Sequence, residues 1–238
     1  MITVVIIVVL VVGGVTYVLL DGSTSSKSAN LLANAGFETG DLRGWQTLPT
    51  YPPAIESTIV PGGASHAARF QTPTNDPAVS GPCLTSGSQC GLLNVSTIYQ
   101  NINNFTLSQG AKFSLAVDPA FQYPSAFQVT LEFGLSPSAV SQTGHSDVFV
   151  YYLVLASSQQ CTTYSGYLVR SSPSGTTAAV HCLTAPIGTW TSVSRQIGSD
   201  LPSGVTASEL NGSQVTLSVS FAGASPTDQV YLGALYFG

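Results

Sequence analysis

LLANAGFETGDLRGW, residues 31–45, places two large aromatic side chains within a run of closely spaced glycines. Phe37 and Trp45 each carry enough apolar surface to anchor the edge of a hydrophobic core. The three glycines permit a tight backbone path between them, because glycine adopts conformations that other residues avoid. The stretch therefore predicts one edge of a packed domain, and the polar segment before it, 21–30, reads as a linker.

Short apolar or alternating stretches recur along the rest of the chain between turn residues, and none forms a convincing amphipathic helix. Val129, Leu131 and Phe133 share one face of their strand, and a second strand repeats the pattern from Val215 to Phe221. Residues 31–238 are therefore predicted to form one mainly β domain, a jelly-roll β-sandwich. Its ten expected strands cover 54–59, 67–70, 97–102, 112–117, 127–133, 148–155, 166–169, 190–197, 214–221 and 230–237.

Four cysteines permit three disulfide pairings. We favour Cys83 with Cys90 and Cys161 with Cys182, because these pairs close segments that already read as a loop (71–93) and a hairpin (156–189). Zinc binding is disfavoured, since the sequence has no C-x-x-C spacing.

The composition favours an exported protein. Asn94, Asn104 and Asn211 each begin an N-x-S/T sequence, which predicts glycosylation. Together with disulfides, these sites favour an extracellular location. Six Lys and Arg against eleven Asp and Glu leave no basic patch for nucleic acid.

The first twenty residues form an uncharged apolar run, and the first positive charge, Lys27, follows it. Twenty helical residues would span about 30 Å, which favours an N-terminal hydrophobic α-helix over 1–20 that acts as a membrane stalk or filament core. Thirteen of the twenty are Val, Ile or Thr, so a strand donated to a neighbouring subunit is the main alternative. The expected assembly residues are Ile2, Val5, Val8, Val9, Val12, Gly13, Gly14 and Leu19.

Residues 31–45 resemble the N-x-G-F-E-x-G-x-x-x-G-W opening of galactose-binding-like jelly rolls of the carbohydrate-binding-module type. Weaker matches at 66–70, 98–102, 112–115, 189–191 and 230–235 extend the resemblance over about 31–238. In that family a Glu at the position of Glu38 often helps to bind a structural calcium ion. Glu38 and Asp41 are therefore candidate calcium ligands, although Gly233 stands where the family places an Asp.

Residues 1–30 resemble the stalk of type IV pilin-like subunits, especially archaeal ones, in which hydrophobic helices bundle inside a filament. Val5 stands where bacterial pilins usually carry Glu, which disfavours a bacterial type and leaves an archaeal type open.

No catalytic motif is present, and His66, His145 and His181 lie in separate segments. The adjacent residues His145-Ser146-Asp147 read as a polar turn, because catalytic triads are assembled from distant segments. The sequence therefore predicts a protein that is not an enzyme. Sugar binding needs aromatic platforms, for which Tyr51, Tyr123, Tyr151, Tyr152 and Tyr164 are available, but most of these tyrosines are better explained by packing within strands.

The leading interpretation is a structural subunit of an extracellular type IV pilus-like filament, a helical homopolymer whose precursor sits in the membrane. A membrane-anchored carbohydrate-binding or adhesion domain, with surface glycans as partners, is the alternative. A filament assembled by N-terminal donor-strand exchange is the third. No cofactor is expected beyond the candidate calcium.

Overall fold

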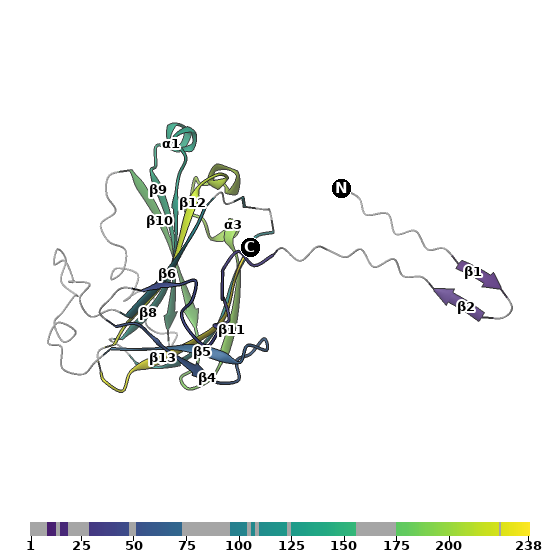
Figure 1. The fold of residues 1–238 in the computed structure, drawn as a ribbon. Coiled ribbons are helices and arrows are strands. Elements are labelled where there is room, and N and C mark those ends of the chain that lie inside the picture. The colour runs from purple at the N-terminus through teal and green to yellow at the C-terminus, as the bar shows by residue number, and fades with distance from the viewer. Residues whose placement is uncertain are drawn as a thin grey trace.

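The computed structural model shows two β-sheets facing each other across one core (Figure 1). It describes residues 9–12, 15–18, 29–47, 51–72, 96–103, 106–107, 110–122, 125–155, 175–223 and 225–238. The six-stranded sheet has the order β10 (Thr176–Thr184), β9 (Asp147–Leu155), β8 (Ala126–Gly134), β12 (Gln214–Ala222), β6 (Ser96–Ile102) and β3 (Gln46–Thr47). The five-stranded sheet has the order β11 (Thr191–Gln196), β7 (Lys112–Ala120), β13 (Gln229–Phe237), β5 (His66–Gln71) and β4 (Ala54–Ser57).

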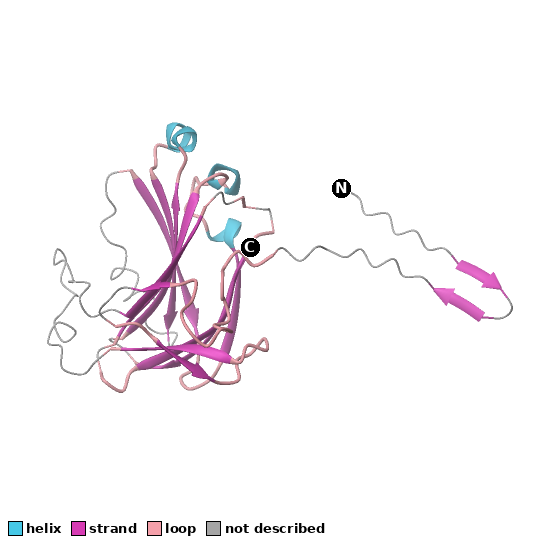
Figure 2. Cartoon of the chain, in the orientation of Figure 1, coloured by secondary structure: helices cyan, strands magenta, loops and turns pink. Residues whose placement is uncertain are grey.

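Helices contribute little to the described residues. They are α1 (Pro137–Thr143), α3 (Ile197–Asp200) and the 3-10 helix η3 (Ala207–Leu210), and Figure 2 shows them as short coils between strands. No helix in the described ranges has the length and apolarity needed to cross a bilayer. The predicted mainly β sandwich is confirmed.

The core consists of the alternate residues that the sequence pattern selects. The residues predicted to face the core are fully buried, both on β8 (Val129, Leu131 and Phe133) and on β12 (Val215, Leu217, Val219 and Phe221). The two strands pair in antiparallel register, so that Leu131 lies opposite Leu217. Phe37 and Trp45 are also buried, with their ring centroids 5.8 Å apart, as predicted for the edge of the core.

Only the second arm of the hairpin predicted over 156–189 is described, as β10, so the hairpin itself stays a prediction. β10 runs parallel to β9, with Thr176 opposite Asp147 and Thr184 opposite Leu155. A parallel pair needs a long crossover, and residues 156–174 are long enough to supply one. The predicted strand 166–169 lies outside the described residues. β3 and β10 are strands that were not among the ten expected from the sequence.

The N-terminal run differs from the expected helix wherever it is described. β1 (Val9–Val12) and β2 (Val15–Val18) are strands that pair antiparallel, from Val9 with Val18 to Val12 with Val15. Their β-branched residues favour extended structure, and a Gly-Gly pair between two such runs is a typical hairpin sequence. The helix prediction is therefore wrong for Val9 and Val12. The other expected assembly residues, Ile2, Val5, Val8, Gly13, Gly14 and Leu19, lie outside the described residues.

A buried ion pair joins the two sheets beside β9 and β10. Asp200 of α3, 2% exposed, accepts hydrogen bonds from Arg195 Nε at 2.8 Å and Arg195 Nη2 at 2.5 Å. Tyr152 of β9 donates to the same carboxylate at 3.0 Å, and His181 Nε2 lies 2.8 Å from the Asp200 carbonyl oxygen. Burial, and then the Asp200 charge, raises the pKa of Tyr152, so this hydroxyl keeps its proton and remains a donor.

The start of the head lies against its last strand. Leu31 N donates to Phe237 O at 2.8 Å. The Asn30 side chain donates to Leu235 O at 2.8 Å and accepts from Phe237 N at 3.1 Å. Figure 1 shows the C end beside this entry point. Residues 30–31 are thus fixed to β13, the central strand of the five-stranded sheet.

Candidate functional site

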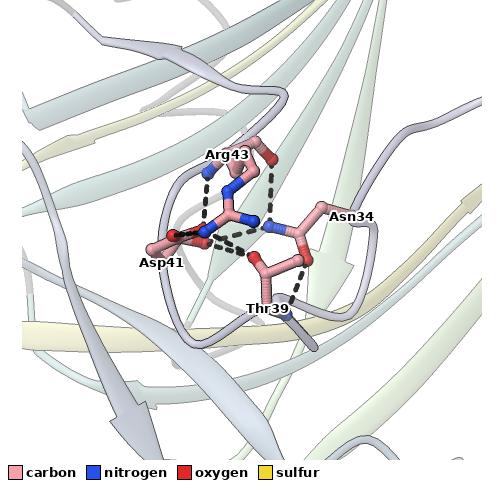
Figure 3. Close-up of polar contacts among 4 residues, drawn as sticks. All are labelled: Asn34, Thr39, Asp41 and Arg43. Carbon is pink, nitrogen blue, oxygen red and sulfur yellow. Dashed lines mark hydrogen bonds and ion pairs between the residues drawn. The ribbon is translucent and has the colours of Figure 1, made fainter.

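The 31–45 loop is organised by one asparagine (Figure 3). Asn34 Nδ2 donates to the carbonyl oxygens of Asp41 at 2.9 Å and Arg43 at 3.0 Å, and its Oδ1 accepts from Thr39 N at 3.2 Å. Asn34 itself has a φ of 47°, a conformation that asparagine tolerates better than most residues. The loop therefore owes its shape to its own amide and carbonyl groups.

The candidate calcium ligands are engaged elsewhere. The Asp41 carboxylate accepts from Thr39 Oγ1 at 2.6 Å and from Arg43 Nη2 at 2.8 Å. The Arg43 guanidinium therefore already neutralises the carboxylate that would bind calcium. Glu38 Oε2 instead accepts from Ser65 Oγ at 3.0 Å. At Gly233 a Cβ would lie 2.5 Å from Val60 Cγ1, so Val60 fills the space of the family's Asp. The described residues do not fit that calcium site, and they contain no cluster of three or more His, Cys, Asp or Glu suited to a metal.

Most of the predicted covalent sites fall outside the described residues. Cys182, on β10, is disulfide-bonded. Cys83, Cys90 and Cys161 are not among the described residues, so both pairings stay predictions. Asn94 and Asn104 are also outside them. Asn211 is exposed, and its Oδ1 accepts from Leu107 N at 2.9 Å; its glycosylation stays a prediction.

Two groups of Ser, His and acidic residues among the described residues are not arranged as catalytic triads. Ser146 Oγ donates to Asp147 at 2.7 Å, as expected for a polar turn. Ser65 Oγ lies 3.0 Å from both Glu38 Oε2 and His66 Nδ1. The serine thus stands between the acid and the histidine, whereas a triad needs the histidine between the other two.

The tyrosines chosen from the sequence do not form a platform. Tyr152 lies in the core, stacked on Phe113, and Tyr151 is 8% exposed. Tyr51 is half-buried, and Tyr123 and Tyr164 lie outside the described residues.

A different set of side chains lines up across the outer face of the five-stranded sheet. Asp118 of β7 lies opposite Tyr231 of β13, and Tyr231 lies opposite Arg69 of β5. Trp190 directly precedes β11, one residue beyond the pair Thr191 and Val117, which puts it beside Asp118. We call these four half-buried residues, Trp190, Asp118, Tyr231 and Arg69, the aromatic row. With strands about 4.8 Å apart, the two aromatic residues lie about 10 Å from each other.

The polar members of the row are incompletely satisfied. Asp118 Oδ1 is buried and has no hydrogen-bond partner, and burial raises the pKa of its carboxyl group. Arg69 Nε lies 2.9 Å from Glu56 Oε1, close enough for an ion pair, although this nitrogen forms no hydrogen bond. Buried polar atoms are normally paired, so Asp118 is an unusual carboxylate. Because the residue as a whole is only half-buried, a ligand that lies between the two aromatic residues can donate hydrogen bonds to its carboxylate.

A loop supports the aromatic row from the side. The connection between β4 and β5 folds back on itself through Val60 N donating to Ala64 O at 3.1 Å and Gly63 N donating to Val60 O at 3.1 Å. Val60, 1% exposed, packs with Ala67 and Ala116 on the outer face of the sheet, and Trp190 and Tyr231 pack against this cluster. Both rings are therefore held in place by apolar contacts.

The aromatic row was not predicted from the sequence, because its members are far apart in the chain. Trp190 and Tyr231 were placed in expected strands, and their alternation with buried neighbours was the available signal. Which strands lie next to each other was not readable from the sequence.

The outer face of the six-stranded sheet also carries aromatic residues, but its polar groups largely bond to one another. Gln128 Nε2 donates to Thr130 Oγ1 at 2.6 Å, and Thr216 Oγ1 donates to Asn101 at 2.9 Å. Phe149 stacks on Tyr151, with centroids 5.8 Å apart and planes 4° from parallel. Gln128 Oε1 on this face is also buried without a hydrogen-bond partner, but it is a neutral amide oxygen, whereas the aromatic row offers a carboxylate.

No family model and no curated protein matches the chain. Among solved structures, it is similar to TmCBM61, solved in complex with β-1,4-galactotriose, with a TM-score of 0.44 and 12% identity over 89% of this chain and 99% of that one. It is also similar to CBM28, a carbohydrate-binding module specific for non-crystalline cellulose, with a TM-score of 0.42 and 12% identity over 88% and 95% of the two chains. The family 30 module of a Clostridium thermocellum cellulosomal cellulase gives a TM-score of 0.41 and 13% identity over 82% and 85%. Similarity of this degree concerns the overall β-sandwich alone.

Proposed function

We propose that this protein is a non-catalytic carbohydrate-binding domain and that the aromatic row is its binding site. One observation carries the proposal: Asp118, with a buried and unpaired Oδ1, lies between Trp190 and Tyr231 on an outer sheet face. Aromatic rings offer flat apolar surfaces to the C–H faces of a sugar, and a carboxylate between them accepts from its hydroxyl groups. The TM-scores above are too low to argue for a shared ligand, so the proposal rests on these residues.

The charges of the site favour a neutral glycan. Asp118 is the acceptor, and Arg69 is partly neutralised by Glu56. A uronic acid or a sulfated sugar would bring a second negative charge next to a carboxylate that is already desolvated, which is unfavourable. A sugar hydroxyl group would instead donate a hydrogen bond to this carboxylate without adding charge.

The surroundings of the row also suit an extended ligand. Of the three large hydrophobic residues that are exposed among the described residues, Ile59 (91%) and Ile187 (48%) lie in the loops that carry Val60 and Trp190. The row crosses β11, β7, β13 and β5, so it provides successive contacts rather than one pocket. A glycan chain running across the strands would meet Trp190, Asp118, Tyr231 and Arg69 in turn.

The test is glycan binding by the full chain, first on an array of neutral and acidic glycans and then by calorimetry with the best neutral ligand. Trp190→Ala and Tyr231→Ala should each lower the affinity by about five- to thirtyfold, because each removes an aromatic contact of about 1 to 2 kcal/mol. Tyr99→Ala is the matched control, since Tyr99 is a half-buried tyrosine on the outer face of the other sheet.

Unchanged affinity in both aromatic variants, or equal loss in Tyr99→Ala, would place the site elsewhere. Failure of the full chain to bind any glycan on the array would refute the function itself. Circular dichroism of each variant separates loss of binding from loss of fold.

The other sequence-based interpretations stay predictions. Extracellular location, membrane insertion and a pilus-like helical bundle are not addressed by the residues described. The strands β1 and β2 do not favour a helical bundle, because that assembly needs residues 1–20 to be helical.

A further inference from the structure

Asp118 carries a negative charge that no side chain of the described residues neutralises. Its Oδ1 has no hydrogen-bond partner, and burial alone raises the pKa of the carboxyl group. A cation close to the carboxyl group would lower this pKa instead. The carboxylate is therefore an uncompensated charge in the middle of the aromatic row, on a residue that is only half-buried.

The cationic side chains of the described residues are engaged elsewhere or lie far from Asp118. Arg69, in the same row, is two strands away, which is about 10 Å. Lys112 begins the strand that carries Asp118, about 20 Å away along β7. The described arginines each pair with another carboxylate: Arg43 with Asp41, Arg69 with Glu56 and Arg195 with Asp200. An ion pair with Asp118 is therefore available to a ligand.

The aromatic neighbours of Asp118 favour a cationic ligand as well. Trp190 and Tyr231 occupy the strand positions on either side of it, each about 4.8 Å away. Aromatic rings attract cations to their faces at distances of up to about 6 Å from the ring centroid. Both residues pack against the cluster around Val60, which keeps them beside the carboxylate. A cation held at Asp118 would thus lie next to two aromatic residues.

We propose that the aromatic row prefers glycans with a free amino group on the sugar unit that contacts Asp118, over the same glycans with a hydroxyl or acetamido group there. The protonated amino group donates to the carboxylate and neutralises it, and such a charge-assisted hydrogen bond is about twice as strong as a neutral one. This inference rests on the proposed function and narrows its ligand class. The charge that disfavours anionic glycans also separates, among the remaining glycans, those with an amino group.

Three oligosaccharides of equal length and the same β-1,4-linked backbone test the preference on the full chain. They consist of glucosamine, N-acetylglucosamine or glucose, so they differ only in the substituent at C2 of each sugar. Acetylation removes the charge of the amino group, as it does for lysine. Calorimetry is carried out at about pH 6, where an amino group with an ordinary pKa is protonated.

We expect the glucosamine oligomer to bind about tenfold more tightly than either neutral oligomer, because hydrogen bonds to charged groups are the stronger ones. Raising the salt concentration from about 0.05 to 0.5 M should reduce this preference by screening the ion pair. The affinity for the neutral oligomers should not respond to salt.

Two variants assign the preference to Asp118. Asp118→Asn keeps the shape of the side chain and removes its charge, so the preference should fall to about twofold. Glu132→Gln is the matched control, because Glu132 is also half-buried on an outer sheet face beside an aromatic residue, Phe149, and burial also raises the pKa of its carboxyl group. Glu132 lies on β8 in the other sheet, so this variant should keep the full preference.

Several results would overturn the inference. Equal and measurable affinity for the three oligomers would remove the preference while leaving the proposed function standing. A preference that survives in Asp118→Asn, or that falls equally in Glu132→Gln, would reflect the net negative charge of the chain and not Asp118. Absence of binding by the glucosamine oligomer would also refute the inference, whereas the proposed function is decided separately by the glycan array. Circular dichroism shows whether each variant keeps its fold.

Discussion

Neutralising Asp200 should destabilise the head more than any other single change of charge in the described residues. Its carboxylate is 2% exposed and accepts two bonds from Arg195 and one from Tyr152. Breaking a buried ion pair usually costs about 3 to 5 kcal/mol, because the remaining charge loses its partner. The Arg195 side chain is 37% exposed and can regain some hydration. We therefore expect about 3 kcal/mol for Asp200→Asn, at the lower end of that range.

For a domain of this size, 1 kcal/mol corresponds to about 2 to 4 °C in melting temperature, so Asp200→Asn should melt about 6 to 12 °C lower. Urea unfolding followed by tryptophan fluorescence gives the free energy directly. Arg195→Met should cost at least as much, since it leaves a buried carboxylate without its cation.

The double variant Asp200→Leu/Arg195→Met makes the argument refutable. An apolar pair of similar volume often replaces a buried ion pair at little cost, so the double variant should be more stable than Arg195→Met alone. If the free energy of unfolding of Asp200→Asn stays within about 1 kcal/mol of the wild type, Asp200 and Arg195 are not a coupled buried pair. The same conclusion follows if the loss of stability in the double variant equals the sum of the losses from changing each position alone.

Three further outcomes are expected. Gly233→Ala should lower the free energy of unfolding by about 1 to 3 kcal/mol, because the new Cβ meets Val60, and Val60→Ala in the same chain should recover part of the loss in urea titrations. Burial raises the pKa of Asp118 in the folded state above its ordinary value of 3.8. The folded state is therefore stabilised by protonation of Asp118 below pH 3.8, and this stabilisation is lost as the pH rises through the folded-state pKa. Asp118→Asn should therefore unfold at higher urea than the wild type near neutral pH but not at strongly acid pH, while binding glycan more weakly in calorimetry. Calcium or EDTA should leave the melting temperature unchanged, because Arg43 already pairs with Asp41 and Val60 fills the space at Gly233; a clear rise with calcium would contradict this.

The parts of the fold that the sequence predicts are those set by local alternation. The core residues of β8 and β12 were predicted correctly, because that prediction requires only that residues two apart point to the same side of a strand. The direction of β10 depends on which strand it meets, and that choice is made by contacts with residues far away in the chain. Periodicity alone could not supply it.

The predictions for the N-terminal run and for the candidate site failed for different reasons. At Val9–Val12 the length of the apolar run favoured a helix, whereas the β-branched side chains favour the strand that the structure has. In the aromatic row, Arg69 and Tyr231 are neighbours although 161 positions separate them in the sequence. Such a site becomes visible only once the register of β5, β13 and β7 is known.

The bonds from residues 30–31 to β13 also have a mechanical consequence. Any pull on the N-terminal segment enters the head at Asn30 and Leu31 and passes directly into β13, which carries Tyr231. β13 is bonded on both sides, to β5 and β7, so a load along its axis is shared as shear among many hydrogen bonds instead of peeling them one at a time. Tension between the N-terminal segment and a ligand held at Tyr231 would thus run first along a single, centrally placed strand, and the bonds between Ala33 and Gln100 of β6 would pass part of it to the six-stranded sheet.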